Sequence, residues 1–492
     1  MVLKLFGAGR PDHPLADPKE AKRILEALPP QDLKALEELS QWLESASSAE
    51  GFKPADRLQL IGSLDDLALA RARKVSRDYF AATRPSRYQE NLMWTRLHEY
   101  WRQAGLAWAR AVEVAVQAKD MKSLPLLACR ALRALGQQLK WQHMRYGPID
   151  AAVWGAINKL YLAAEERKLA EAKVPVGAET SARLEFLKAA MFSASSPDGL
   201  LPAEIELAER IVADQAAAFL LTNAPAREHL FWTDLQQAIA PQRAVKTMPG
   251  TPGLRGIGPG AAMSSIESLA AKIRQTRQVP SSMNLGATYD YEVVLEVLDH
   301  LALHWAHEPP ERRHARHPVK SRLAVTNSFK GVVDCLGGLS FDKQSGEAWI
   351  VENVSAGGFG AVVPQVKGDW LRVGALLALQ PDGGTNWVVG VVRRVNKVTN
   401  QEARVGIETV SRAPQVLEFG LGALGRHTGI LLPSAVLGSG EVSVALPANV
   451  YSRGLNLEAD FGGKQHMYMP ASGAERGEDY ELLRFREMVR DG

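Results

Sequence analysis

The stretch RRHARHPVK, residues 312–320, lies where the hydrophobic pattern of the chain changes. Before it, apolar residues recur every three or four positions, as they do on one face of a helix. After it, short runs rich in β-branched residues alternate with turn residues. Five arginine or lysine residues fall between positions 312 and 322, although the formal net charge of the whole chain is only +3. The stretch therefore separates a helical half from a β half and carries a local cluster of positive charge.

The composition is that of an ordinary globular chain. Its 492 residues are 46% apolar, which at about 100 to 200 residues per domain predicts two to four domains. The near balance of 58 Lys and Arg against 55 Asp and Glu argues against a general nucleic-acid or membrane binder. No secretory signal or run of about 18 apolar residues is present, so we expect a cytoplasmic protein. Cys129 and Cys335 are far apart in sequence, which favours neither a disulfide framework nor a cysteine metal site.

Residues 1–240 are predicted to form a helical domain. The sequence ADPKE offers Asp17 as an N-cap, Pro18 at the first helical position and Glu20 to complete a capping box. A second helix follows Pro30, and short polar or Pro/Gly breaks separate the later ones, as in an antiparallel bundle or an array of helical hairpins. Those later helices are predicted over residues 56–79, 87–118, 123–143, 149–170, 179–192 and 202–221.

Residues 241–287 are predicted to be a Gly/Pro-rich linker with one short helix. The sequence MPGTPGLRGIGPG, residues 248–260, contains eight Gly or Pro in thirteen positions, which disfavours both helix and strand. The short helix is expected near residues 263–277. A longer helical run then makes residues 288–308 a connecting helix.

The β half is predicted to contain a small antiparallel barrel and a C-terminal extension. Residues 309–412 include about six or seven short strands separated by turns such as DKQSG and PDGG. Residues 413–492 continue the β pattern as a further β-rich subdomain. The predicted fold class is therefore multidomain α + β: an N-terminal all-α bundle or hairpin array, a small antiparallel barrel and a C-terminal β-rich extension.

Two short motifs in the β half carry the functional prediction. RRHAR, residues 312–316, has the spacing Arg-x-x-x-Arg, and NVSAGG, residues 353–358, has the spacing Asn-x-Ser-x-x-Gly. Together with the strands WVVGVVRRV and RVGIETV, this order resembles the PilZ family of cyclic di-GMP receptors and implies a PilZ-like barrel over residues 309–412. The ligand-binding residues that the resemblance implies are Arg312, Arg313, Arg316, Asn353, Ser355 and Gly358.

The chemistry of these residue types suits that ligand. Cyclic di-GMP has two phosphodiester anions and two guanines, and a planar guanidinium can bond either a phosphate or the O6 and N7 edge of guanine. The resemblance implies a bacterial effector that binds cyclic di-GMP without turning it over and acts on processes such as motility or biofilm formation. We expect the helical N-terminal domain to contact a protein partner, and we expect no metal or other cofactor.

Two alternatives remain open from the sequence. One is a degenerate PilZ-like scaffold that binds no nucleotide and acts only through protein interactions. The other is a metal site, because His300, His304 and His307 occupy positions i, i+4 and i+7 of a predicted helix beside Asp299. The His-Glu-x-x-His signature is missing, and no nucleophile elbow, phosphate loop or paired-carboxylate motif supplies catalytic residues, so we do not predict an enzyme.

Overall fold

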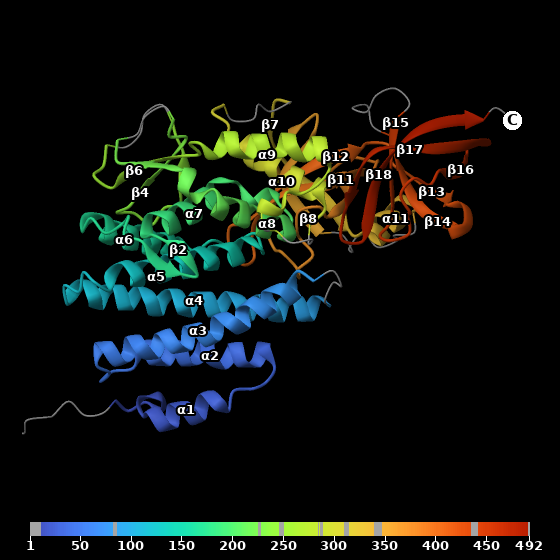
Figure 1. The fold of residues 1–492 in the computed structure, drawn as a ribbon. Helices are drawn as coiled ribbons and strands as arrows, with labels where there is room; N and C mark the ends of the chain where they lie inside the picture. Colours follow the sequence, from blue (N-terminus) through green and yellow to red (C-terminus); the bar gives the residue numbers. More distant parts are fainter. Residues whose placement is uncertain are drawn as a thin grey trace, which may run out of the picture. The chain divides into compact units, whose positions relative to one another are not determined.

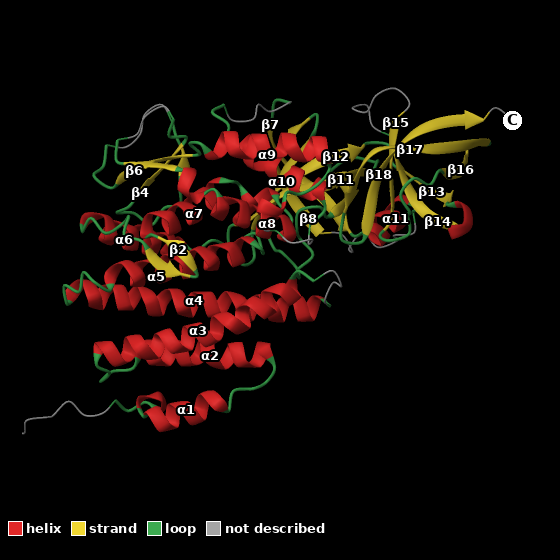
Figure 2. Cartoon of the chain, viewed as in Figure 1, coloured by secondary structure: helices red, strands yellow, loops and turns green. Residues whose placement is uncertain are grey.

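The computed structural model describes residues 11–81, 86–224, 228–245, 250–283, 285, 289–308, 314–338, 347–433 and 441–490. Helices dominate its N-terminal part and strands its C-terminal part (Figure 2). The chain divides into two compact units. Unit 1 comprises Met1–Met144, Ile149–Pro197 and Pro202–Pro310, and unit 2 comprises Arg145–Pro148, Asp198–Leu201 and Glu311–Gly492. The predicted order of helices, antiparallel barrel and β-rich C-terminal region is confirmed.

Unit 1 is built mainly of helices. They are α1 (Pro18–Glu26), α2 (Asp32–Ser48), α3 (Pro54–Tyr79), α4 (Arg87–Gln117), α5 (Leu124–His143), α6 (Ala151–Glu166), α7 (Ala182–Ala194), α8 (Pro202–Asp214), α9 (Ala262–Thr276) and α10 (Tyr291–Trp305). Asp17 caps α1 as predicted, because its Oδ1 accepts from the backbone N–H of Lys19 at 2.8 Å. In contrast to the predicted capping box, the side chain of Glu20 pairs with Arg23.

Helices α2 to α5 lie in successive layers and pack along their apolar faces (Figure 1). Leu36, Leu39 and Leu43 of α2 recur at three- and four-residue spacing and are completely buried. None of the helices in the described ranges has both the length and the apolar composition that a bilayer crossing requires.

Unit 1 also contains strands that the sequence analysis did not predict. A hairpin of β1 (Val174–Val176) and β2 (Ala178–Thr180) precedes α7. A four-stranded sheet in the order β3-β6-β4-β5 occupies the region before and after the expected end of the helical domain. Its strands are β3 (Leu220–Thr222), β4 (Phe231–Asp234), β5 (Gln242–Arg243) and β6 (Leu254–Gly258). The N-terminal half is therefore not all-α.

The prediction that the Gly/Pro-rich stretch 248–260 is a linker is wrong for its described residues, whereas the short helix predicted near residues 263–277 is present as α9 (Ala262–Thr276). Strand β6 lies inside the Gly/Pro-rich stretch, pairs with both β3 and β4, and buries Ile257 completely. Its glycines serve close packing rather than flexibility. A Cβ atom at Gly258 would lie 2.4 Å from the carbonyl oxygen of Glu228. A strand that other backbone segments approach closely also needs glycine, so a high density of Gly and Pro does not by itself indicate a linker.

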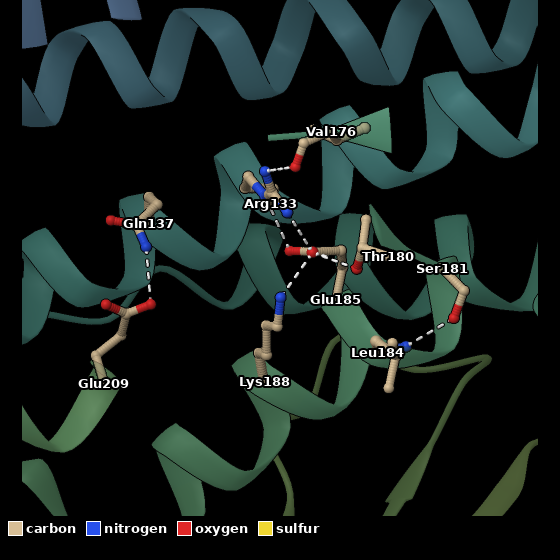
Figure 3. A network of polar contacts seen from close by, with 9 residues as sticks. All are labelled: Arg133, Gln137, Val176, Thr180, Ser181, Leu184, Glu185, Lys188 and Glu209. Atoms are coloured by element: carbon tan, nitrogen blue, oxygen red, sulfur yellow. Dashed lines mark hydrogen bonds and ion pairs between the residues drawn. The ribbon is translucent and has the colours of Figure 1, made fainter. Parts of the chain in front are cut away.

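A buried polar network ties the β1–β2 hairpin to the helices of unit 1 (Figure 3). Glu185 of α7 is 3% exposed and accepts from Arg133 of α5 at 2.7 Å, from Lys188 at 2.9 Å and from the hydroxyl of Thr180 at 2.6 Å. Arg133 also donates to the backbone carbonyl of Val176 in β1. Burial alone raises the pKa of Glu185, but these donors outweigh it and lower the pKa below its ordinary value.

This network predicts an acid-sensitive contribution to the stability of unit 1. Because the pKa of Glu185 is lower in the folded than in the unfolded state, its contribution is complete above the unfolded value of 4.5 and is lost as pH falls through the folded value. Denaturant unfolding of the wild type and of Glu185→Gln, followed by circular dichroism between neutral pH and pH of about 3, tests this. The stability difference between the two proteins should shrink with acidification, and a constant difference would contradict it.

Unit 2 contains two closed six-stranded antiparallel barrels (Figure 1). The first has the order β10-β11-β12-β9-β8-β7 and the second the order β13-β14-β15-β18-β17-β16. The first contains β7 (His317–Asn327), α11 (Phe329–Leu336), β8 (Glu347–Ser355), β9 (Gly358–Val363), β10 (Leu376–Pro381), β11 (Val388–Lys397) and β12 (Ala403–Ser411). The second contains β13 (Gln415–Gly420), β14 (Arg426–Leu432), β15 (Glu441–Pro447), β16 (Leu457–Phe461), β17 (Lys464–Arg476) and β18 (Tyr480–Arg490).

The two barrels share one hydrophobic core cluster. It joins α11, β10 and β11 of the first barrel to β14, β15 and β18 of the second. Polar contacts follow the same seam: the hydroxyl of Tyr480 donates to the carbonyl of Gly374 at 2.9 Å, and Asp479 accepts from the N–H of Phe329 at 2.7 Å. The second barrel is thus packed against the first as part of the same compact unit.

Candidate ligand-binding site

The candidate site lies at one end of the first barrel, where β7 begins and β8 turns into β9. His317, the first residue of β7, pairs with Val354, and Pro318 pairs with Asn353. This antiparallel register places the segment 314–316 beside the end of β8. Ser355 pairs with Gly358 across the tight β8–β9 turn. The fold therefore brings the start of β7 to the strand end that carries the Asn-x-Ser-x-x-Gly sequence.

Of the predicted arginines, only Arg316 is among the described residues. It is exposed and directly precedes β7, whereas Arg312 and Arg313 lie outside the described residues. The neighbouring His314 lies against the β8–β9 turn, since a Cβ atom at Gly357 would be 3.0 Å from its Cδ2. The side chain of His314 therefore lies beside the turn.

Asn353 and Ser355 are partly buried at this end of the barrel. The carboxamide of Asn353 packs over Gly360, where a Cβ atom would lie 2.7 Å from both Oδ1 and Nδ2. Asn353 Oδ1 is buried and has no hydrogen-bond partner among the described residues. The hydroxyl of Ser355 is near the carbonyl oxygen of Gly358, at 3.4 Å.

Gly358 is required by close packing. A Cβ atom at this position would lie 1.9 Å from the carbonyl oxygen of Ile407 in the neighbouring strand β12. Its Cα partner in β12 is Glu408. Any side chain at residue 358 would force β9 away from β12 and open the barrel beside the turn.

Strand β12 and the residue directly after it supply two polar side chains that the sequence analysis missed, Thr409 and Arg412. The N–H of Thr409 donates to the carbonyl of Gly357 at 2.9 Å, and Arg412 Nη2 donates to the carbonyl of Ala356 at 3.2 Å. Thr409 Oγ1 is buried and, like Asn353 Oδ1, has no partner among the described residues. The sequence signal that could have pointed to Arg412 is its position as a basic residue just beyond the predicted last barrel strand, RVGIETV, which ends at Val410. Only the pairing of β12 with β9 brings it to the turn.

Two other arginines that could have added charge to the site are engaged elsewhere. Arg393 of β11 pairs with Glu408 at 2.6 Å and with Glu475 at 2.8 Å. Burial tends to lower the pKa of Arg393, but these carboxylates outweigh it and raise the pKa above its ordinary value. Arg394 pairs with Asp198. Within the described ranges, by contrast, no carboxylate pairs with Arg316 or Arg412.

The three histidines considered for a metal site do not all lie on one helical face. The helix ends at Trp305, so His307 lies beyond it. His300 Nε2 is 2.7 Å from the carbonyl oxygen of Ser195, and the rings of His300 and His304 are 4.4 Å apart. Over the residues that the structure describes, no group of three or more His, Cys, Asp or Glu side chains is arranged to hold a metal ion.

The chain matches two family models. Residues 19–226 match the model described as "Cyclic-di-GMP receptor FimW, N-terminal domain". Residues 342–415 match the model described as "Cyclic-di-GMP receptor FimW, middle PilZ domain", a range that contains Asn353, Ser355 and Gly358 and begins after Arg316. The two matches together cover more than half of the chain. A comparison with curated proteins finds no match.

Proposed function

Since the chain belongs to the cyclic-di-GMP receptor FimW family, we propose that it binds cyclic di-GMP at the β8–β9 turn of its first barrel and passes this signal to a protein partner of its helical domain. In this proposal residues 309–412 are the nucleotide-binding domain and residues 413–492 a supporting subdomain. The ligand contacts are those predicted from the sequence: Arg312, Arg313, Arg316, Asn353, Ser355 and Gly358.

The observation that carries the proposal is the unsatisfied amide of Asn353. Leaving a buried acceptor without a donor costs about 1–3 kcal/mol, so such an atom favours the binding of a group that donates a hydrogen bond to it. Asn353 Oδ1 is such an atom, and it lies on the strand end beside the segment that carries Arg316. The N–H and NH₂ groups on the Watson–Crick edge of guanine are donors that can satisfy a carboxamide oxygen. When the amide group is turned so that Oδ1 and Nδ2 exchange places, Nδ2 can instead donate to a guanine acceptor.

Electrostatics supports an anionic ligand here. Arg316 is exposed beside the turn and is not neutralised by a carboxylate in the described part of the chain. A guanidinium forms charge-assisted, bidentate hydrogen bonds to a phosphodiester and can stack on a purine face. The ligand would be bound, not converted, because the site contains no pair of groups arranged for acid–base or nucleophilic catalysis among its described residues.

The signalling part of the proposal concerns the helical domain. The N-terminal match covers α1 to α8, so this domain is a recognised part of a cyclic-di-GMP receptor family. We infer that nucleotide binding changes which surface of the helical domain a partner protein can reach, because a ligand acts by favouring the conformation it binds best. In this proposal the partner protein acts in a process such as motility or biofilm formation.

The proposed compartment is the cytoplasm. Cys129 and Cys335 are both buried and unpaired. Burial raises the pKa of the Cys129 thiol to about 12, so it stays protonated and unreactive at neutral pH. Unpaired cysteines are usual for a reducing compartment.

Arg316→Ala is expected to weaken cyclic di-GMP binding by about 10- to 100-fold, because it removes charge-assisted hydrogen bonds to the ligand. Isothermal titration calorimetry on the full-length protein measures this. Arg322→Ala is the matched control. Arg322 is exposed on β7, the strand that Arg316 directly precedes, but it pairs with Ile350, away from the turn, so the substitution should leave affinity within about twofold.

The possible results of this titration distinguish three interpretations of the barrel. Tight binding by the wild type and by Arg322→Ala, with weak binding by Arg316→Ala, supports the site. A wild type that gives no heat with cyclic di-GMP identifies the barrel as a degenerate scaffold. Full-strength binding by Arg316→Ala refutes the assignment of the site even if the protein is a receptor.

A further inference from the structure

We propose that Arg412 is a ligand-binding arginine that approaches the nucleotide from the β12 side of the turn, opposite Arg316. This inference rests on the proposed function and adds a residue that the Asn-x-Ser-x-x-Gly and Arg-x-x-x-Arg sequences do not include. It makes the site a three-sided one, formed by the start of β7, the β8–β9 turn and the end of β12.

The first observation is that the backbone of Arg412 is held in place. It follows Ser411, which is buried and whose hydroxyl donates to the carbonyl of Pro433 at 2.8 Å. The same hydroxyl accepts from the N–H of Ala413 at 3.3 Å. Three residues earlier, the N–H of Thr409 is bonded to the carbonyl of Gly357. A binding residue is effective when neighbouring contacts fix its position, and Arg412 meets this requirement.

The second observation is that the Arg412 guanidinium is directed to the turn but is mostly unused. Among the described residues it makes one hydrogen bond, to the carbonyl of Ala356, although an arginine offers five N–H donors. The other arginines at strand positions nearby behave differently. Arg393 is held between two carboxylates, and Arg404 of β12 lies 3.8 Å from Glu352. The Arg412 residue is exposed, and the donors of its guanidinium that have no partner in the described part of the chain can bind an incoming anion.

The third observation is the hydroxyl of Thr409. It is buried and has no hydrogen-bond partner among the described residues, although it lies on the strand that borders the turn. Asn353 Oδ1 has the same property on the other side of β9. Two buried polar atoms, on the two strands that flank β9, thus have no hydrogen-bond partner in the described part of the chain, and a bound ligand would supply one.

The charge of the ligand suits a site with arginines on both sides of the turn. Cyclic di-GMP carries two phosphodiester anions, and Arg316 directly precedes β7 whereas Arg412 directly follows β12, the strands on either side of the β8–β9 pair. Arginine binds phosphate through two parallel hydrogen bonds, which lysine cannot form. We therefore assign Arg412 to a phosphodiester of the bound nucleotide.

The test is calorimetric titration of the full-length protein with cyclic di-GMP at low and high salt. Arg412→Ala should weaken binding by about tenfold or more and reduce its salt dependence, because a screened charge contact is lost. Arg412→Lys keeps the charge without the planar fork and should fall between the alanine variant and the wild type. Arg404→Ala, which removes an exposed arginine from the same strand, is the control and should bind like the wild type.

A second measurement tests whether Arg412 contacts the ligand directly or only stabilises the β8–β9 turn. Hydrogen exchange of the ligand-free protein over residues 354–360 should be the same in Arg412→Ala and in the wild type. Faster exchange there with unchanged salt dependence would make Arg412 a positioning residue and overturn the proposal. Wild-type affinity in Arg412→Ala, together with weak binding by Arg316→Ala, would also overturn the proposal. A wild type that does not bind at all refutes the proposed function itself.

Discussion

Tyr480→Ala is expected to lower the free energy of unfolding of unit 2 by about 3–5 kcal/mol, the usual cost of deleting a large buried side chain. Tyr480 is fully buried at the seam between the barrels, in one cluster with Phe329 and Val332 of α11 and with Leu376 of β10. Its loss would leave a cavity on both sides of the seam and an unpaired carbonyl at Gly374.

Hydrogen exchange resolved by segment is the measurement for this variant. Exchange in Tyr480→Ala should rise in β10 and β11 of the first barrel as well as in β14, β15 and β18 of the second. Tyr468→Ala is the matched control, because Tyr468 is equally buried but belongs to the core cluster of the second barrel alone. Its effect should be strongest in the second barrel. Protection of the first barrel that survives Tyr480→Ala unchanged would show that the barrels are stable independently.

Lys140→Met is expected to destabilise unit 1 by about 3–5 kcal/mol, because it leaves a carboxylate buried without its main partner. Lys140 of α5 lies 2.7 Å from Glu206 of α8, and both side chains are only 6% exposed. Burial alone would lower the pKa of Lys140, but Glu206 and Glu209 outweigh it and raise the pKa. The lysine is therefore charged in the folded protein, and Arg210 remains as the other partner of Glu206.

Denaturant unfolding followed by far-UV circular dichroism measures the loss. Lys159→Met is the control, since it breaks an ion pair of similar length, 2.9 Å, whose side chains are 73% and 55% exposed, and should cost about 1 kcal/mol or less. The double variant Lys140→Met/Glu206→Leu should recover much of the stability, because it removes the buried carboxylate as well. Equal losses in the two single variants would contradict the role assigned to burial.

The helix boundaries show how much of the fold can be predicted from the local sequence pattern alone. The prediction of a helix over 87–118 compares with Arg87–Gln117 in the structure, and that over 123–143 compares with Leu124–His143. These boundaries follow from apolar periodicity and from Pro and Gly breaks, which are properties of adjacent residues. The predicted helix over 202–221 was too long, because its last residues form β3, and a strand of three residues has no periodicity of its own.

The sequence motifs and the tertiary structure contributed different parts of the candidate site. The spacing of Asn353, Ser355 and Gly358 identified one turn, because the three residues are neighbours along the chain. Thr409 and Arg412 could not be recognised in the same way. They are more than fifty positions away, and their contact with the turn depends on β12 pairing with β9 instead of with another strand.

By itself, the sequence determined the change from helices to strands near residue 312, the family resemblance and the glycine turn at residues 353–358, because each depends on residues close together in the chain. The tertiary structure decided that the Gly/Pro-rich stretch near residue 255 forms a buried strand, that two barrels share one core cluster, and that β12 borders the β8–β9 turn. These features arise from pairing and packing between distant segments, whose energy depends on which surfaces meet once the chain has folded.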